Sequence, residues 1–98
     1  MNVIKKIEEW FEKECNGDWE HSYGFRIQNL DNPGWLVDID IVDTVLEDKD
    51  FTPIKILRSD DNWINCKIEK KVFKGRGGIC NLEEILSTFI NWSDCNRS

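Results

Sequence analysis

A glycine-rich segment beside a cysteine is the first place where this sequence could carry out chemistry. The segment reads Gly75-Arg76-Gly77-Gly78-Ile79-Cys80-Asn81 and leads into a predicted helix. Glycine-rich loops at helix N-termini hold anions on their backbone N–H groups, and the helix dipole together with Arg76 would lower the pKa of Cys80. Thiol transfer and phosphate chemistry are both compatible with this pattern. The spacing matches neither a P-loop nor a dinucleotide-binding motif, so the alternative is a connecting loop with an unreactive thiol.

The only histidine lies in a second segment that is dense in polar and aromatic groups. Residues 18–23 read Asp-Trp-Glu-His-Ser-Tyr. His21 could act with Cys15, or be oriented by Asp18 or Glu20, as nucleophilic catalysis requires. Alternate side chains of an extended loop point apart, so a hydrogen-bonded structural histidine is the alternative. We therefore predict no catalytic residues, and the segment is either a binding surface or a corner of the core.

Two carboxylates lie close together on a predicted strand. Asp38 and Asp40 alternate with apolar residues over residues 35–41 and so share one face of a sheet. Such a pair could bind a cation or serve acid–base chemistry. No third ligand accompanies the pair, and outward-facing positions on an antiparallel sheet with one wet side are the alternative. We predict neither a metal site nor a cofactor.

Length and composition indicate one globular domain spanning residues 1–98, with an ordered core over about residues 2–92. No apolar run approaches the roughly 20 residues of a membrane span, and the charged N-terminus does not resemble a signal peptide. We therefore expect a cytoplasmic protein with no membrane partner. The four cysteines form no Cys-x-x-Cys pair, and free thiols are expected in a reducing compartment.

The net charge of −6 argues against nucleic-acid binding and would suit a basic partner. The charge is uneven, because acids concentrate in residues 38–50 and bases in residues 67–76. One sheet could therefore present an acidic end and a basic end. A solvated polar face is the alternative.

Helical periodicity appears at both ends of the chain. Apolar residues recur at steps of three and four over residues 2–14, with Asn2 as the N-cap and Gly17 as the left-handed residue beyond the helix. A second helix is predicted over residues 81–92, where Asn81 and Glu84 have the spacing of a capping box. The apolar stripe of each helix needs a partner surface to bury it.

Strands are predicted between the two helices. Alternating patterns over residues 25–28 and 35–41 flank a turn in which Pro33 fixes φ and Gly34 supplies the positive φ of a type II turn. Further strands are predicted over residues 54–57 and 64–72. With no βαβ unit, the prediction is a two-layer α+β domain. Its mainly antiparallel sheet has three to four strands, with an N-terminal and a C-terminal helix packed on it.

Several motifs together resemble the immunity protein 53 family. They are Cys-Asn-Gly-Asp-Trp-Glu-His-Ser-Tyr-Gly over residues 15–24, Leu-Asp-Asn-Pro-Gly-Trp over 30–35, Asp61-Asn62-Trp63 with Cys66, Phe73-x-Gly75-x-Gly77-Gly78, and a closing helix with Phe89 and Trp92. The resemblance runs from about Ile7 to Trp92. It implies a bacterial immunity protein of a polymorphic toxin system, which is not an enzyme and binds and neutralises a cognate toxin domain in the cytosol. A nuclease is one candidate toxin, and the immunity protein itself is expected to be a monomer.

An acidic surface would steer encounter with a basic toxin and imitate its phosphate substrate. The predicted toxin-binding residues are Asp18, Trp19, Glu20, His21, Asp38, Asp40, Asp43 and Glu47. The competing interpretation is that the motifs shared with the family hold the fold and that the interface lies elsewhere. Two other classes stay open at this point: a small sulfurtransferase-like enzyme that uses Cys80, and a structural or assembly module.

Overall fold

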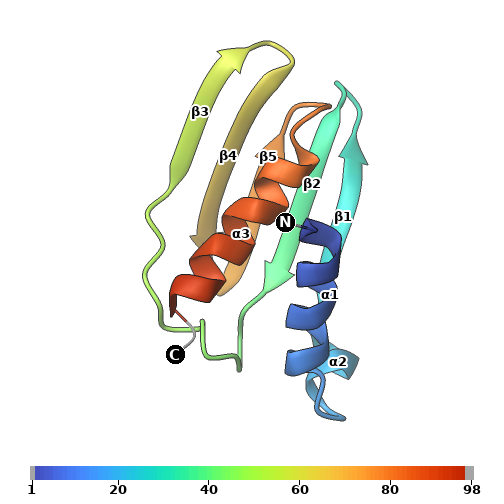
Figure 1. Cartoon of the computed structure of the whole chain (residues 1–98), viewed down its shortest axis with the longest axis vertical. Helices are drawn as coiled ribbons and strands as arrows, with labels where there is room; N and C mark the ends of the chain where they lie inside the picture. The colour runs from blue at the N-terminus through green and yellow to red at the C-terminus, as the bar shows by residue number, and fades with distance from the viewer. Residues whose placement is uncertain (1, 97–98) are drawn as a thin grey trace.

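The computed structural model describes residues 2–96 of the chain. Its elements, in order, are α1 (Val3–Glu14), α2 (Trp19–Ser22), β1 (Phe25–Leu30), β2 (Gly34–Asp40), β3 (Ile54–Ser59), β4 (Asn62–Glu69), β5 (Val72–Gly77) and α3 (Leu82–Asn96) (Figure 1). The five strands form one antiparallel sheet in the order β1-β2-β5-β4-β3. The predicted α+β class with an N-terminal and a C-terminal helix is confirmed.

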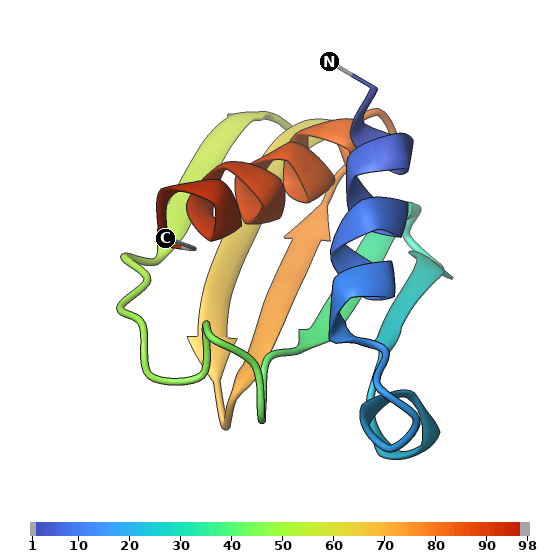
Figure 2. The ribbon, with the colours of Figure 1, turned by 60° about the horizontal axis from the view of Figure 1, so that its bottom comes forward.

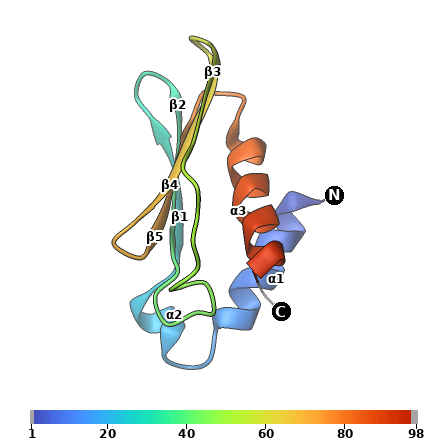
Figure 3. The same ribbon diagram turned by 90° about the vertical axis from the view of Figure 1, so that its left-hand side faces the viewer.

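The helices α1 and α3 lie on the same face of the sheet and make the second layer (Figures 2 and 3). Their buried residues meet the apolar positions of β2, β4 and β5, and the buried core is formed by Val3, Ile7, Trp10, Trp19, Val37, Ile39, Ile41, Leu46, Ile64, Cys66, Phe73, Ile85, Leu86, Phe89 and Ile90. The ring of Phe89 packs edge-on against Trp10, with centroids 5.0 Å apart, and against Phe73 at 5.1 Å. Ile4 is one of the apolar residues that recur over residues 2–14, but it is 53% exposed and does not join the buried stripe of α1.

The prediction of three to four strands was wrong, because the segment taken for a glycine-rich loop is a fifth strand. β5 lies in the interior of the sheet, between β2 and β4. On Gly75 and Gly77 an added Cβ would collide with the side chain of Ile85 on α3. These glycines therefore let the helix approach the sheet, which is a packing role and not that of an anion-binding loop.

The turn between β4 and β5 explains why the strand was missed. Lys70 and Lys71 both have positive φ, at 54° and 63°. Two-residue hairpin turns of this kind normally carry Asn-Gly or Asp-Gly, whose backbones accept positive φ without strain. Two lysines give no such signal, so residues 64–72 look like one uninterrupted strand in the sequence.

The ends of α1 follow the sequence prediction. The side-chain oxygen of Asn2 accepts a hydrogen bond from the Lys5 backbone N–H at 3.1 Å, as an N-cap does. Gly17 has φ of 96°, which is the left-handed conformation predicted for it.

The start of α3 differs from a capping box. The Asn81 side chain accepts from the Trp63 backbone N–H at 3.3 Å and donates to Glu84 at 2.9 Å. Asn81 therefore ties β4 to the first turn of α3. The helix also continues beyond its predicted end at Trp92 to Asn96, with Ser93 buried.

The β1–β2 hairpin forms as predicted, with Leu30 paired to Gly34. Gly34 does not take the positive φ that was expected of it; it is the first residue of β2 and is buried. Within residues 2–96, the helices are too short or too polar to cross a membrane.

Candidate functional site

Trp19 occupies the core beneath the polar and aromatic segment of residues 18–23. Its side chain is 4% exposed, its indole N–H donates to the Val42 carbonyl at 2.9 Å, and its ring lies edge-on to Trp10 at 5.9 Å. The side-chain oxygen of Asn16 accepts from the Asp18 and Trp19 backbone N–H groups, both at 2.9 Å, which starts the short helix α2. Trp19 therefore anchors this segment, and its neighbours are left at the surface.

Glu20 binds its own chain. One carboxylate oxygen accepts from the backbone N–H of Asn16 at 2.9 Å, and the other accepts from that of Gly17 at 2.9 Å. The pKa of Glu20 is lowered, mainly by a hydrogen bond from its own backbone N–H and further by those from Asn16 and Gly17. Burial raises this pKa, but by less than the hydrogen bonds lower it. The next residue, His21, is exposed.

The fold brings two of the predicted acidic regions together. A hollow of about 450 Å³ is lined by Asn16, Asp18, Trp19, Ser22, Tyr23 and Asp43, and we call it the acidic hollow. Asp43 comes from the connection after β2 and has φ of 59°, a conformation that Asp tolerates better than most residues. Asp18, Trp19 and Asp43 were predicted as binding residues and do meet here; Glu47 lies further along the same connection and is half-buried.

Asp38 and Asp40 lie on the face of the sheet opposite the helices, and the protein's own groups engage both. Asp38 is 12% exposed in its side chain and accepts from Arg76 at 2.9 Å and Arg26 at 3.2 Å. Asp40 accepts from the Gly24 backbone N–H at 3.0 Å. Neither lines the acidic hollow. Asp38 is therefore largely neutralised within the sheet.

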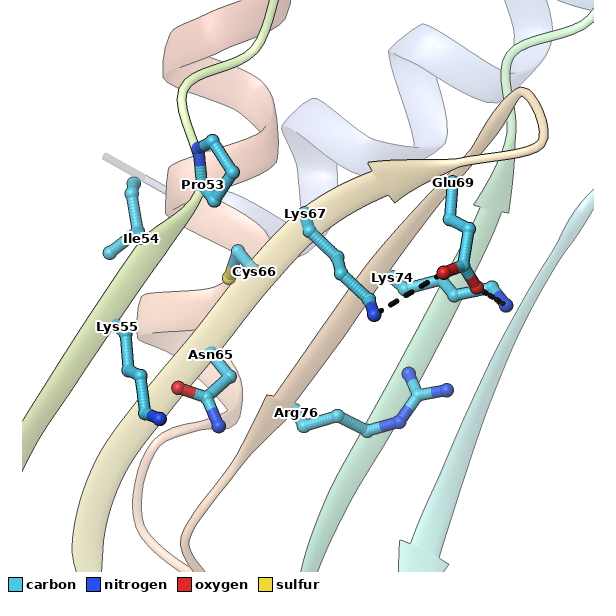
Figure 4. Close-up of a pocket in the computed structure, with 9 residues that line it drawn as sticks. All are labelled: Pro53, Ile54, Lys55, Asn65, Cys66, Lys67, Glu69, Lys74 and Arg76. Carbon is cyan, nitrogen blue, oxygen red and sulfur yellow. Dashed lines mark hydrogen bonds and ion pairs between the residues drawn. The ribbon is translucent and has the colours of Figure 1, made fainter.

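A second hollow, of about 460 Å³, lies over β3, β4 and β5 and is lined mainly by cationic and polar side chains (Figure 4). We call it the basic hollow; its lining residues are Pro53, Ile54, Lys55, Asn65, Cys66, Lys67, Glu69, Lys74 and Arg76. The β4–β5 register places Lys67 opposite Lys74 and Asn65 opposite Arg76. Sequence reasoning noticed the basic run of residues 67–76 but missed the hairpin that folds it back on itself.

The cysteines that were considered as nucleophiles lie in different environments. Burial, followed by the charges of Glu20 and two other nearby carboxylates, raises the pKa of Cys15, which is the opposite of what an activated thiol needs. Burial likewise raises the pKa of Cys66 to about 11. Cys80 is exposed in the turn between the end of β5 and the start of α3. Residues 2–96 contain no group of three His, Cys, Asp or Glu side chains placed to hold a metal ion.

A comparison with known families decides the class of this protein. The family model described as immunity protein 53 matches residues 4–94, which is nearly the whole chain. The chain belongs to the immunity protein 53 family. Membership of this family implies an immunity protein, and it confirms the resemblance seen in the motifs. The matched range includes both hollows. Neither the curated proteins nor the solved structures include a significant match.

Proposed function

We propose that this protein neutralises a cognate toxin domain by binding it directly in the cytosol. Family membership is the observation that carries the proposal. The architecture supports it, because interlocking aromatic rings such as Trp10, Phe73 and Phe89 join the two layers of the fold. A rigid domain loses little conformational entropy on association, and tight inhibition benefits from that.

The acidic hollow is the surface that we assign to the toxin. Asp18, Tyr23 and Asp43 surround it with two carboxylates and an exposed phenol ring. Carboxylates steer a basic partner, such as a nuclease, and occupy the site of its phosphate substrate. We assign exposed His21 and half-buried Glu47 to the same surface, because they follow Asp18 and Asp43 along the chain. The buried Trp19 lines the hollow, and Glu20 binds the backbone of Asn16, which also lines it.

The direct test is co-purification with the toxin domain encoded by the neighbouring gene. We expect a stoichiometric complex, and we expect cells that produce both proteins to grow while cells that produce the toxin domain alone do not. A toxin domain that remains separate from this protein during purification, in cells that it still kills, would contradict the proposal.

The surface assignment needs its own variants. Asp18→Asn with Asp43→Asn removes two charges, and asparagine retains the tolerance of positive φ that Asp43 requires. We expect the affinity for the toxin domain to fall by at least about tenfold. The matched control is Asp31→Asn with Asp94→Asn, which removes the same number of charges. These exposed residues lie in the β1–β2 turn and on α3, and neither lines the acidic hollow. Equal affinities for the two variants would place the interface elsewhere.

A further inference from the structure

The open face of the sheet, defined as the side opposite α1 and α3, is left uncovered by the helices (Figure 3). The strand registers place Lys55 opposite Asn65 across β3 and β4, and Lys67 opposite Lys74 across β4 and β5. These four side chains all line the basic hollow. The sheet therefore fixes the backbone positions from which these side chains project.

The open face carries more positive charge than its own carboxylates neutralise. Lys67 and Lys74 share one carboxylate, Glu69, at 3.4 Å and 2.9 Å (Figure 4). Arg26 and Arg76 share another, Asp38. Each set therefore retains one positive charge in excess.

Lys55 adds a further charge, since its ammonium group makes no ion pair or hydrogen bond within residues 2–96. Asp40, at the end of β2, and Asp60, in the β3–β4 turn, offset two of these three charges, so the open face keeps a small positive excess. The chain as a whole has a net charge of −6, so a positive face stands out on an otherwise acidic protein.

Apolar side chains lie directly beside these charges. A hollow of about 270 Å³ over β3 and β4 is lined by residues that include Ile56, Leu57 and Trp63. Leu57 is 77% exposed and lies opposite the half-buried Trp63 across the β3–β4 pair. Lys55 and Asn65 line both this hollow and the basic hollow. The two hollows therefore form one continuous surface with a cationic part and an apolar part.

We propose that the open face is a second contact surface for the toxin domain and receives an acidic segment of it, with an apolar side chain seated beside Leu57 and Trp63. This inference rests on the proposed function and adds to the acidic hollow. Charge complementarity selects the partner, because carboxylates would pair with the excess cations around Lys55 and Lys74. A nucleic acid is disfavoured by the net charge of the whole chain.

Nuclear magnetic resonance can locate the contact on the intact protein. The ¹⁵N-labelled protein is titrated with the unlabelled toxin domain of the neighbouring gene. We expect the backbone amides of Lys55, Asn65 and Lys67 to shift or broaden together with those of Asp18 and Asp43. Changes confined to the acidic hollow would overturn the second contact and leave the proposed function intact. A spectrum without any change would overturn both.

A charge-reversal pair tests the chemistry of the contact. Lys55→Glu with Lys67→Glu reverses two exposed charges of the basic hollow, and Lys6→Glu with Lys13→Glu makes the same change on the exposed side of α1. We expect the first pair to weaken toxin binding by about tenfold or more and the control to weaken it by less than about threefold. Lys55→Gln with Lys67→Gln repeats the test if the reversed protein unfolds.

Two results would overturn this assignment. Equal losses in the two pairs would mean that only the net charge of the protein matters. A single-stranded oligothymidylate that shifts the same amides and competes with the toxin domain would assign the open face to nucleic acid instead.

Discussion

The backbone of Gly34 in β2 lies against the backbone of Gly77 in β5. A Cβ atom at Gly34 would be 2.5 Å from the carbonyl oxygen of Gly77, a distance that no side chain can occupy. The Asp-Asn-Pro-Gly-Trp motif therefore has glycine at its fourth position because the interior strands β2 and β5 meet there. The sequence suggested that the turn conformation requires a glycine at this position, but Gly34 does not have the positive φ that would require one.

Gly34→Ala should destabilise the protein by about 1–3 kcal/mol, as overpacked positions do, because the clash is with backbone that cannot rotate away. Gly24→Ala is the control, since a Cβ there would lie 4.0 Å from Phe11, at ordinary contact distance. Urea unfolding measures both. Similar urea midpoints for the two variants would show that β2 and β5 can move apart without loss of stability.

The β4–β5 turn should be improvable. Lys70→Asn with Lys71→Gly replaces two residues of positive φ by the pair that this turn prefers. We expect the free energy of unfolding to rise by about 1 kcal/mol, because left-handed conformations cost ordinary residues roughly that much. The exposed ion pair of Lys71 with Asp48 is lost, at little expense. An unchanged unfolding midpoint would mean that the lysines are not strained.

Trp19 and His21 lie two positions apart but should behave differently. Trp19→Ala removes a buried ring and its hydrogen bond to Val42 and should cost about 3–5 kcal/mol of stability. His21→Ala alters an exposed side chain and should leave the melting temperature unchanged. Thermal unfolding followed by circular dichroism compares them. A strongly destabilised His21→Ala protein would refute this division between structural and surface roles.

Acid should weaken the link between β3 and α3. The Arg58 guanidinium donates to both oxygens of Glu84, at 2.9 Å and 2.7 Å, and these hydrogen bonds are the main cause that lowers the pKa of Glu84 below 4.5. Because the folded pKa is lower than the unfolded one, this stabilisation is present above about pH 4.5 and disappears as the pH falls through the folded pKa.

Comparison with Glu84→Gln isolates that effect. At pH 7 the variant should melt at a lower temperature than the original protein, and the difference should shrink as the solution is acidified towards the folded pKa. A constant difference across the range would indicate that Glu84 acts through packing and not through its charge.

Thiol titration distinguishes an inhibitor from a thiol-dependent enzyme. Cys80 and Cys95 are exposed and should react with a disulfide reagent at similar rates, whereas Cys66 is buried with a raised pKa and should react only on unfolding. Cys80→Ser and Cys95→Ser variants assign the two fast phases. If Cys80 reacted more than about tenfold faster than Cys95, an activated thiolate and the enzyme hypothesis would return.

The sequence by itself determined the features that depend on neighbouring residues. The three- and four-residue periodicity of α1, its Asn2 cap and the alternation of β2 are local patterns, and each is present in the fold. The family also followed from short motifs such as residues 15–24 and 30–35. Such local patterns predict the folded structure well, because a hydrophobic stripe and a helix cap each favour one kind of local structure.

Only the tertiary structure decided where these elements meet. Asp38 looks like an exposed acid in the sequence, yet Arg26 and Arg76 arrive from neighbouring strands to pair with it. Asp18 and Asp43 reach one hollow because α2 packs beside the connection that follows β2. Strand pairing and packing join residues that are far apart in the chain, and no periodic pattern records which partner a strand will choose. The charge of each surface is therefore a property of the register and not of composition.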